Sequence, residues 1–196
     1  MKAVFIDRDG VINKDPGGWT EHSYVTKWEQ FKFLPGALEA LKILNENGIK
    51  VMLISNQAGV GKGHFSRNEL DAVTGKMIKE VRRAGGDIEA VYYCTHKKED
   101  NCDCRKPNTG LIEKAVEKFD IDPAATYFIG DSEVDCIAGR RAGCKTIFVL
   151  SGKTSREEMN KWHEKPDYIF ANLLEAAGWV LKKEKRRSQR ASRRDK

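Results

Sequence analysis

Two aspartates follow the first apolar segment of the chain, with the spacing of a catalytic carboxylate pair. Asp7 and Asp9 come directly after Ala3–Ile6 and are separated by one residue. Alternate residues of an extended segment point to the same side, so both carboxylates can face one pocket. Two neighbouring carboxylates repel each other unless a cation joins them. Mg²⁺ binds carboxylate oxygens and keeps positions open for a phosphate, so the pair predicts a magnesium site.

Polar residues that suit a phosphoryl group follow three later apolar segments. Ser55 and Asn56 end one of them, Lys106 comes after the next, and Asp131 follows the third. Asp131 can supply a further metal oxygen. Lys106, the Ser55 hydroxyl and Asn56 can neutralise the charge of the phosphoryl oxygens. A carboxylate can attack phosphorus to give a mixed anhydride that water hydrolyses. Each residue alone is an ordinary turn, cap or surface residue, but their joint order predicts a phosphatase.

Short apolar, β-branched segments alternate with amphipathic stretches along the chain, which is typical of an α/β fold. The predicted strands are Ala3–Ile6, Lys50–Ser55, Ala90–Cys94, Tyr127–Ile129, Thr146–Leu150 and Tyr168–Phe170. The predicted helices are Ala37–Asn47, Arg67–Ala84, Gly110–Phe119, Glu133–Ala142, Arg156–Glu164 and Leu173–Lys183. Such a pattern forms a mostly parallel central sheet flanked by helices, and ligands bind beyond the carboxyl ends of its strands. The irregular stretch 11–33 is expected to form a loop near the site.

Three cysteines and a histidine lie within eleven residues, in a pattern that suits zinc. Cys94, His96, Cys102 and Cys104 offer the soft ligands of a tetrahedral Zn²⁺ site. Four protein ligands leave no open position, so the predicted zinc is structural, and it would fix the loop that leads into Lys106. The alternative is a set of free thiols beside a surface histidine. An odd number of cysteines, five in all, argues against a disulfide framework.

The positive net charge of the chain comes from its C-terminal end. Nine of the 35 basic and two of the 29 acidic residues lie from Lys182 onward, which leaves 26 basic and 27 acidic residues in the rest. We expect one domain over residues 1–181 and a basic, disordered tail over 182–196. The tail is either a solvated extension or a contact for nucleic-acid phosphates. No segment resembles a membrane span or a signal peptide, so a cytoplasmic monomer is expected.

Four of these motifs occur in the order found in the haloacid-dehalogenase-like (HAD) hydrolases, which this sequence resembles over residues 3 to about 150. That superfamily has an Asp-x-Asp-Gly motif, a Ser or Thr after the second strand, a downstream Lys and a Gly-Asp-x-x-x-Asp motif. Here these are Asp7-Arg8-Asp9-Gly10, Ser55, Lys106 and Gly130-Asp131-Ser132-Glu133-Val134-Asp135. The resemblance implies a Rossmann-like HAD fold, without a large cap domain.

The resemblance also implies a role for each residue. Asp7 would be the nucleophile, and Asp9 the acid that protonates the leaving oxygen and then activates water. Asp7, the backbone carbonyl of Asp9, and Asp131 would hold Mg²⁺. Ser55 and Lys106 would steady the transferred phosphoryl group. Asp135 would support the site from behind these residues.

The cysteine–histidine cluster and the Arg105-Lys106-Pro107 run that follows it look like the branch of heptose bisphosphate and histidinol phosphatases. The stretch from Ser55 to Phe65 is more similar to the heptose enzymes, which implies a small sugar phosphate as the substrate. By that likeness the distal phosphate would meet Arg105. The other substrate contacts would be Asp15, Asn56, Gln57, Ala58 and Ser132.

The sequence departs from this branch at several positions. Ser132 stands where the family usually has a substrate-binding Lys, Asn108-Thr109 replaces a common His-Pro, and the first loop is longer by several residues. These departures leave the sugar and its anomer open. Rival substrates are histidinol phosphate and the 3′-phosphate end of a polynucleotide. A rival of another class is a nucleic-acid-binding accessory protein that acts through the basic tail.

Overall fold

The centre of the fold is a parallel sheet of six strands, in the order β3-β2-β1-β4-β5-β6. It is seen in a computed structural model that describes residues 1–194, with side chains up to residue 189. The strands are β1 (Ala3–Ile6), β2 (Lys50–Asn56), β3 (Ala90–Cys94), β4 (Tyr127–Gly130), β5 (Lys145–Val149) and β6 (Tyr168–Phe170). The sequence predicts all six to within one residue at each end, and the α/β fold is confirmed.

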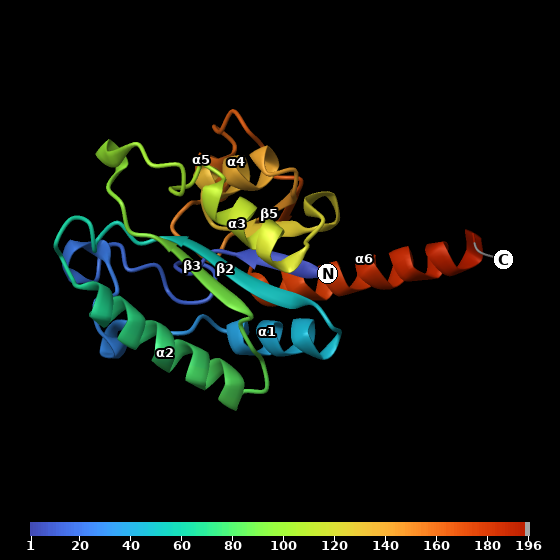
Figure 1. Ribbon diagram of the computed structural model, residues 1–196, viewed down its shortest axis with the longest axis horizontal. Coiled ribbons are helices and arrows are strands. Elements are labelled where there is room, and N and C mark those ends of the chain that lie inside the picture. The colour runs from blue at the N-terminus through green and yellow to red at the C-terminus, as the bar shows by residue number, and fades with distance from the viewer. Residues whose placement is uncertain (195–196) are drawn as a thin grey trace.

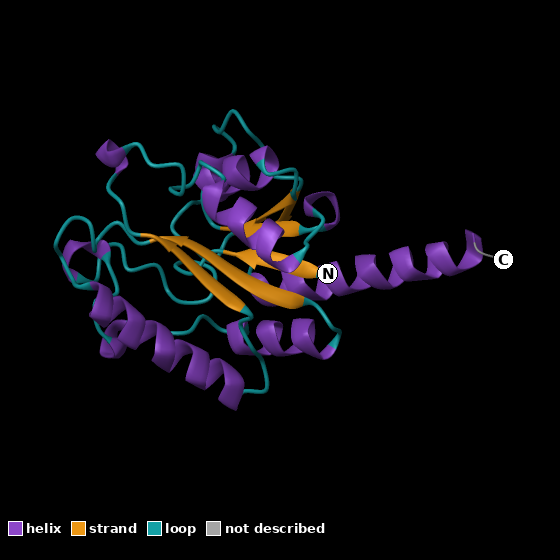
Figure 2. Cartoon of the chain, in the orientation of Figure 1, coloured by secondary structure: helices purple, strands orange, loops and turns teal. Residues whose placement is uncertain are grey.

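Helices cover both faces of this sheet (Figures 1 and 2). They are α1 (Ala37–Glu46), α2 (Arg67–Arg83), α3 (Gly110–Phe119), α4 (Glu133–Arg141), α5 (Arg156–Met159) and α6 (Leu173–Arg194). The short 3-10 helices are η1 (Glu21–Ser23), η2 (Trp28–Gln30), η3 (Lys98–Asp100) and η4 (Pro123–Ala125). Of the helices within residues 1–194, none has both the length and the apolar composition that a bilayer crossing requires.

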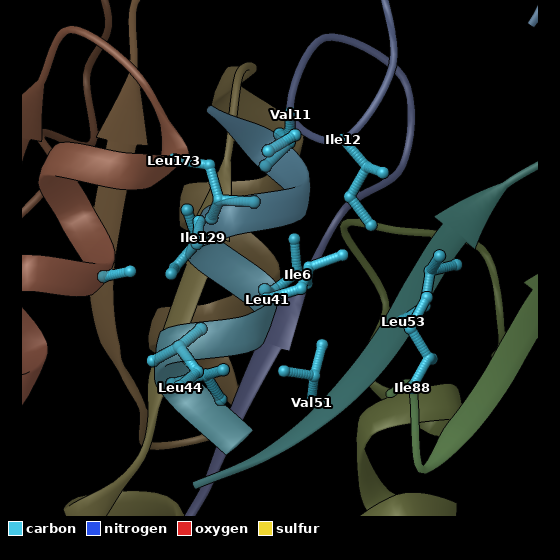
Figure 3. Packing of buried hydrophobic residues seen from close by; sticks show 14 of the residues in the cluster. Ile6, Val11, Ile12, Leu41, Leu44, Val51, Leu53, Ile88, Ile129 and Leu173 are labelled. Atoms are coloured by element: carbon cyan, nitrogen blue, oxygen red, sulfur yellow. The ribbon is translucent and has the colours of Figure 1, made fainter. Parts of the chain in front are cut away.

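The alternation of side chains along β1 explains why both faces of the sheet are apolar. Val4 and Ile6 are buried in a cluster with residues of α1, α2 and α6, whereas Ala3 and Phe5 are buried in a second cluster with residues of α3. Figure 3 shows the first cluster, in which Ile6 lies close to Leu41 of α1. Close packing on both faces fixes the position of β1, and this also restrains the residues that follow it.

The strand order reverses between β1 and β4, and this places the chemical residues together. The chain winds outward from β1 to β3 and then returns to lay β4 against the other side of β1. Ile6 pairs with Ile129, and the amide of Asp7 donates a hydrogen bond of 2.9 Å to the Ile129 carbonyl. Asp7 and Asp131 therefore leave adjacent strands at the same edge, the position where doubly wound sheets bind ligands. Loops gather at this edge, on the left in Figure 2.

Two helix ends differ from the prediction by more than one residue. Helix α5 ends at Met159 instead of Glu164, because the stretch has only Met159 and Trp162 as apolar residues and cannot bury a longer face. Helix α6 runs to Arg194, so the prediction of a disordered tail from Lys182 is wrong for the described part. Its first half docks on the sheet and nucleates the helix, and the Lys, Arg, Gln and Glu residues beyond are strong helix formers. Residues 195–196 of the predicted tail lie outside the described residues.

Candidate active site

A cleft of about 390 Å³ opens at the edge of the sheet where β1, β2 and β4 end. It brings together nine of the residues predicted for the site: Asp7, Asp9, Asp15, Ser55, Asn56, Arg105, Lys106, Asp131 and Ser132. Gln57 and Ala58 do not line it, because both are buried behind its wall. The lining also includes Pro16, His22, Ser23, Tyr24, Lys62, Val134, Asp135 and Lys153.

Three carboxylates converge in the floor of the cleft. Asp7, Asp131 and Asp135 each present an oxygen, and these oxygens lie within 4.8 Å of one another. Burial raises the pKa of Asp7 to about 6, with Lys106 opposing the shift and Asp135 adding to it. Burial also raises the pKa of Asp131, and the charges of Asp135 and Asp7 add to that effect. Close buried carboxylates with raised pKa values are the condition that a bound cation relieves.

The surroundings of these carboxylates fit a small metal ion. The buried Oδ1 of Asp7 lies 2.9 Å from the ammonium of Lys106, but the contact is not aligned as a hydrogen bond, so this oxygen has no hydrogen-bond partner. Asp131 is packed against two glycines: a Cβ on Gly10 would lie 2.3 Å from its Oδ2, and one on Gly152 only 2.0 Å. Only residues without side chains allow the backbone to approach this carboxylate so closely.

Lys106 is a fully buried cation in the same floor. Its ammonium lies 2.9 Å from Asp7 and 2.5 Å from Asp135, and it donates to the Ile54 carbonyl at 2.9 Å. Burial lowers the pKa of Lys106, but Asp135 and Asp7 more than offset this, so the pKa is raised overall and the residue stays charged. The ammonium therefore lies beside the predicted nucleophile, where a transferred phosphoryl group would carry its charge.

Asn56 holds the backbone of Lys106 in place. Its amide oxygen accepts from the Lys106 N–H at 3.0 Å, and its amide nitrogen donates to the Lys106 carbonyl at 3.0 Å. The side chain predicted to contact the phosphoryl group thus fixes the loop that carries the lysine. A sequence pattern signals that an Asn follows β2, but it does not signal which loop of the chain the amide will bind.

Asp9 lies outside the carboxylate cluster and has its own partners. Its carboxylate accepts hydrogen bonds from Arg8, Asn13 and Gln57, the shortest of them 2.8 Å. Arg8 and Gln57 are both fully buried. Sequence reasoning missed Arg8 and Asn13 as parts of the site and assigned Gln57 to the substrate. The predicted metal contact through the Asp9 carbonyl stays a prediction.

The rim of the cleft carries most of the residues that sequence reasoning missed. His22, Ser23 and Tyr24 belong to the irregular loop that was expected near the site, and Lys153 follows β5 at the same edge as the other strand exits. The hydroxyl of Ser132, predicted to contact the substrate, donates to Asp135 within the first turn of α4. Because Lys153 follows β5, its place in the sequence is the signal that identifies it as a candidate site residue.

The cysteine–histidine cluster has the shape of a tetrahedral metal site. The sulfurs of Cys94, Cys102 and Cys104 lie 3.2–3.6 Å apart, and Nδ1 of His96 lies 3.2 Å from the Cys104 sulfur. Four ligands at zinc bond lengths of about 2.0–2.3 Å stand roughly this far apart or slightly farther. The structure thus brings all four predicted ligands together, immediately before Arg105 and Lys106.

Replacing Lys106 by methionine should strongly destabilise the fold in the absence of metal. It leaves two buried carboxylates without their cation, a change worth about 3–5 kcal/mol of unfolding free energy near neutral pH. The pKa of Asp7, about 6 in the native chain, would rise further. When the pKa of a buried aspartate is raised in the folded state, the free energy of unfolding falls as the pH rises through that pKa. The decrease caused by Lys106→Met should therefore be smaller at pH 5 than at pH 7.5.

Urea unfolding at both pH values measures this effect, with Lys62→Met as the matched control. Lys62 is an exposed lysine of the same cleft, and its replacement should change the stability by about 0.5 kcal/mol or less. Equal losses for Lys106→Met at the two pH values would contradict the buried charge pairing.

Comparison with known proteins places the chain in a family. A family model described as "HAD-hyrolase-like" matches residues 103–176. The D-glycero-beta-D-manno-heptose-1,7-bisphosphate 7-phosphatase of Pasteurella multocida is 36% identical over 181 residues, covering 89% of this chain and 94% of that protein. The enzyme of the same name from Neisseria meningitidis serogroup B is 33% identical over 183 residues, covering 92% and 95%.

A solved structure agrees with these relatives. The D,D-heptose 1,7-bisphosphate phosphatase of B. bronchiseptica, crystallised with magnesium and phosphate, superposes with a TM-score of 0.84 at 30% identity. The match covers 93% of this chain and 99% of that one. Given this extent of likeness together with the cleft geometry, the chain belongs to the HAD-like hydrolases, and within them to the heptose-1,7-bisphosphate 7-phosphatase family.

Proposed function

We propose that this protein is a Mg²⁺-dependent phosphatase that removes the 7-phosphate of D-glycero-D-manno-heptose 1,7-bisphosphate. The observation that carries the proposal is the buried group of Asp7, Asp131 and Lys106 at the reversal of the strand order. The names of the relatives supply the substrate. Arg105, Lys62 and Lys153 also line the cleft and offer cations for the second phosphate of a bisphosphate.

The reaction proceeds in two displacements. A carboxylate oxygen of Asp7 attacks phosphorus, the bond to the leaving sugar oxygen breaks, and that oxygen takes a proton from Asp9. Water then attacks the phosphorus of the aspartyl phosphate and gives a proton to Asp9. This step releases inorganic phosphate and restores the Asp7 carboxylate. Lys106 and the Ser55 hydroxyl stabilise the negative charge of the phosphoryl oxygens in both steps.

Mg²⁺ would be held by Asp7, Asp131 and the backbone carbonyl of Asp9. When bound, it supplies positive charge that offsets the carboxylates and polarises the phosphoryl group. The Oδ1 of Asp7, which accepts no hydrogen bond, and the glycine-packed Asp131 support this site. The B. bronchiseptica phosphatase was crystallised with magnesium, which supports the choice of ion. Asp135 binds Lys106 and Ser132 and would orient the lysine.

Contacts to the sugar and the distal phosphate are assigned to the cleft lining. Arg105 would meet the distal phosphate, and Asp15 a sugar hydroxyl, since both side chains line the cleft. Asn56 and Ser132 line it too, but their polar atoms are engaged with Lys106 and Asp135. Gln57 and Ala58, expected beside the substrate, are better assigned to supporting positions because both are buried.

The rival substrates have less support. The relatives described above are named for heptose bisphosphate, not for histidinol phosphate or for nucleic-acid ends, and they span about nine tenths of this chain. A substrate bound through the basic tail would also lie far from the cleft. Helix α6 starts after β6 at the cleft edge and runs back to the opposite edge, where Lys2 contacts Glu184 and Ser188. A monomeric state and a cytoplasmic location stay predictions.

A structural Zn²⁺ would be bound by Cys94, His96, Cys102 and Cys104. The cluster of three sulfurs and one imidazole nitrogen is the support for it. Nδ1 is the nitrogen of His96 that faces the sulfurs. The metal would hold the loop around η3, and with it the start of the segment that carries Arg105 and Lys106.

Helix α6 supports a second function of another class, the binding of a polyanion such as nucleic acid. The helix projects from the body (Figure 1) and is rich in Lys and Arg from Lys182 onward. The sequence beyond Leu181 contains Ala191 as its sole apolar residue. A helix that lies in a membrane interface needs an apolar face, so an electrostatic partner fits better.

A phosphate-release assay tests the main proposal. The substrates are the heptose 1,7-bisphosphate, histidinol phosphate and a 3′-phosphorylated oligonucleotide. We expect the highest kcat/KM with the heptose bisphosphate, only when Mg²⁺ is present.

Asp7→Asn should lower kcat by about three orders of magnitude or more because it removes the nucleophile. Asp71→Asn, an exposed aspartate of α2, should leave kcat unchanged. A better rate on either rival would overturn the substrate, and an active Asp7→Asn variant would overturn the mechanism.

Elemental analysis tests the zinc site. We expect about one zinc per chain in the wild type, and much less in Cys102→Ser. Loss of the metal should also lower kcat, because the loop before Lys106 loses its anchor. The control is Cys144→Ser, a cysteine outside the cluster, which should keep its zinc. A zinc-free wild type after purification without chelators would refute the site.

Fluorescence anisotropy with a 20-base-pair duplex tests the second function. Wild-type binding should weaken steeply as salt rises, since each phosphate contact releases counterions. Deleting residues 189–196 removes four basic residues and spares the contacts of Glu184. The deletion should weaken binding by about tenfold or more and leave sugar phosphate turnover intact. Absence of salt-sensitive binding in the wild type would end this hypothesis.

A further inference from the structure

Arg8, the middle residue of the Asp7-Arg8-Asp9 motif, is a buried cation at the back of the cleft. It has no exposed surface, and its guanidinium contacts both carboxylate oxygens of Asp9, at 3.1 and 3.0 Å from Nη2. Its Nη1 makes no well-aligned hydrogen bond, and the ring of Tyr93 lies 5.7 Å from the guanidinium. The buried charge of Arg8 is thus paired with a carboxylate that lines the cleft, which places Arg8 where it can hold that carboxylate.

Gln57 connects this arginine to two residues of the cleft. Its Oε1 accepts from Arg8 Nη2 at 3.1 Å, while its Nε2 donates to Asp9 Oδ2 at 2.8 Å and lies 3.2 Å from Ser55 Oγ. The side chain is fully buried, so water does not compete for these bonds. One amide therefore touches the proposed proton donor and the proposed phosphate-binding hydroxyl at once.

The chemistry of arginine fixes which way the amide of Gln57 points. A guanidinium has donors only, so the group that faces Arg8 must be the amide oxygen. The amide nitrogen is then left to face Asp9 and Ser55, and it can only donate. Ser55 Oγ thus accepts from Gln57, and the single hydroxyl hydrogen of Ser55 is left to be donated elsewhere, toward the cleft that Ser55 lines.

Asp9 is held from two further directions. Asn13 donates to its Oδ1 at 2.8 Å, and Arg8 Nε lies 3.3 Å from the same oxygen. Asn13 is itself anchored, since its amide also donates to the Lys14 carbonyl at 2.9 Å and the residue is fully buried. Both carboxylate oxygens of Asp9 are therefore located by buried donors, which restricts its movement relative to Ser55.

We propose that Arg8 and Gln57 form a positioning pair that sets the direction of the Ser55 hydroxyl and the place of the Asp9 carboxylate together. Arg8 orients the Gln57 amide, and the amide orients Ser55 as a donor to the phosphoryl oxygen and holds Asp9 at a fixed separation from it. Neither residue touches the substrate. The proposal rests on the proposed function, since it assigns Asp9 to proton transfer and Ser55 to the phosphoryl group.

Dependence on the leaving group tests this pair. A sugar alkoxide needs a proton as it leaves, whereas p-nitrophenolate leaves without one, so misplacing Asp9 should slow the sugar phosphate more. Gln57→Leu keeps nearly the same volume and removes every polar contact of the amide. We expect kcat with heptose 1,7-bisphosphate to fall by about 100-fold and kcat with p-nitrophenyl phosphate by about tenfold or less. Arg8→Lys keeps the buried positive charge but loses the paired N–H donors of the planar guanidinium. It should change the ratio of the two rates in the same direction as Gln57→Leu.

Asp9→Asn provides the matched background. If Gln57 acts on the leaving group through Asp9, Gln57→Leu should no longer change the ratio of the two rates once Asp9 is replaced, and the combined loss should fall short of additive. A merely structural role would lower both rates equally in either background and lower the melting temperature in parallel. Equal losses on the two substrates in folded Gln57→Leu and Arg8→Lys would overturn the pair.

Failure of the proposed function can be distinguished from failure of the Arg8–Gln57 pair. The ratio can be measured with any alkyl phosphate that the enzyme hydrolyses, so poor turnover of the heptose bisphosphate would refute that substrate and leave the test intact. Full activity of Asp7→Asn would refute the nucleophile. A changed ratio together with normal melting temperatures supports the pair.

Discussion

The contact of the Lys106 ammonium with Asp7 and Asp135 is the interaction on which the rest of the site depends. Three carboxylates, those of Asp7, Asp131 and Asp135, are buried within a few ångströms of one another, and one ammonium accompanies them. With all four groups charged, two negative charges remain in a poorly solvated floor, and such an excess is unfavourable without a partner. A divalent cation balances it. Burial and the charge of Asp135 raise the pKa of Asp7 to about 6, and a divalent cation in this floor would favour the ionised carboxylate.

The position of Lys106 is in turn determined by two loops and the sheet beneath them. Asn56, at the end of β2, binds its backbone on both sides, and its ammonium also donates to the Ile54 carbonyl. The cysteine–histidine cluster lies directly before it in the chain, so a metal there would restrain the approach of the lysine from the other end. A flexible lysine would pay side-chain entropy each time it met a phosphoryl group. Its restraint by backbone contacts means that its charge is already in place before the substrate arrives, which is what electrostatic stabilisation of a transition state requires.

Much of this arrangement could be predicted from the sequence because it depends on order along the chain. Strands of β-branched residues, parallel pairing and the rule that ligands lie beyond strand ends were enough to gather Asp7, Ser55, Lys106 and Asp131. What the sequence could not predict is which buried donor meets which acceptor. Gln57 was expected at the substrate, yet its amide turns inward to Arg8, a choice set by the three-dimensional path of the loop after β2. The helical state of residues after Lys182 was missed for a related reason: composition alone favours disorder, whereas a helix already docked through Leu173 and Val180 continues at little further cost.

The two charged features of the molecule lie at opposite edges of one sheet, and this separates what each can do. Because all six strands are parallel, every strand ends at the cleft edge, and α6, which follows β6, must run back toward the strand beginnings. The basic part of α6 extends past that far edge, beside Lys2 at the start of the chain. At physiological ionic strength, charges that far from the cleft are screened from it. The cations that act on a phosphate ester in the cleft are therefore those of its own lining, and any polyanion bound along α6 would leave the cleft free to turn over its substrate.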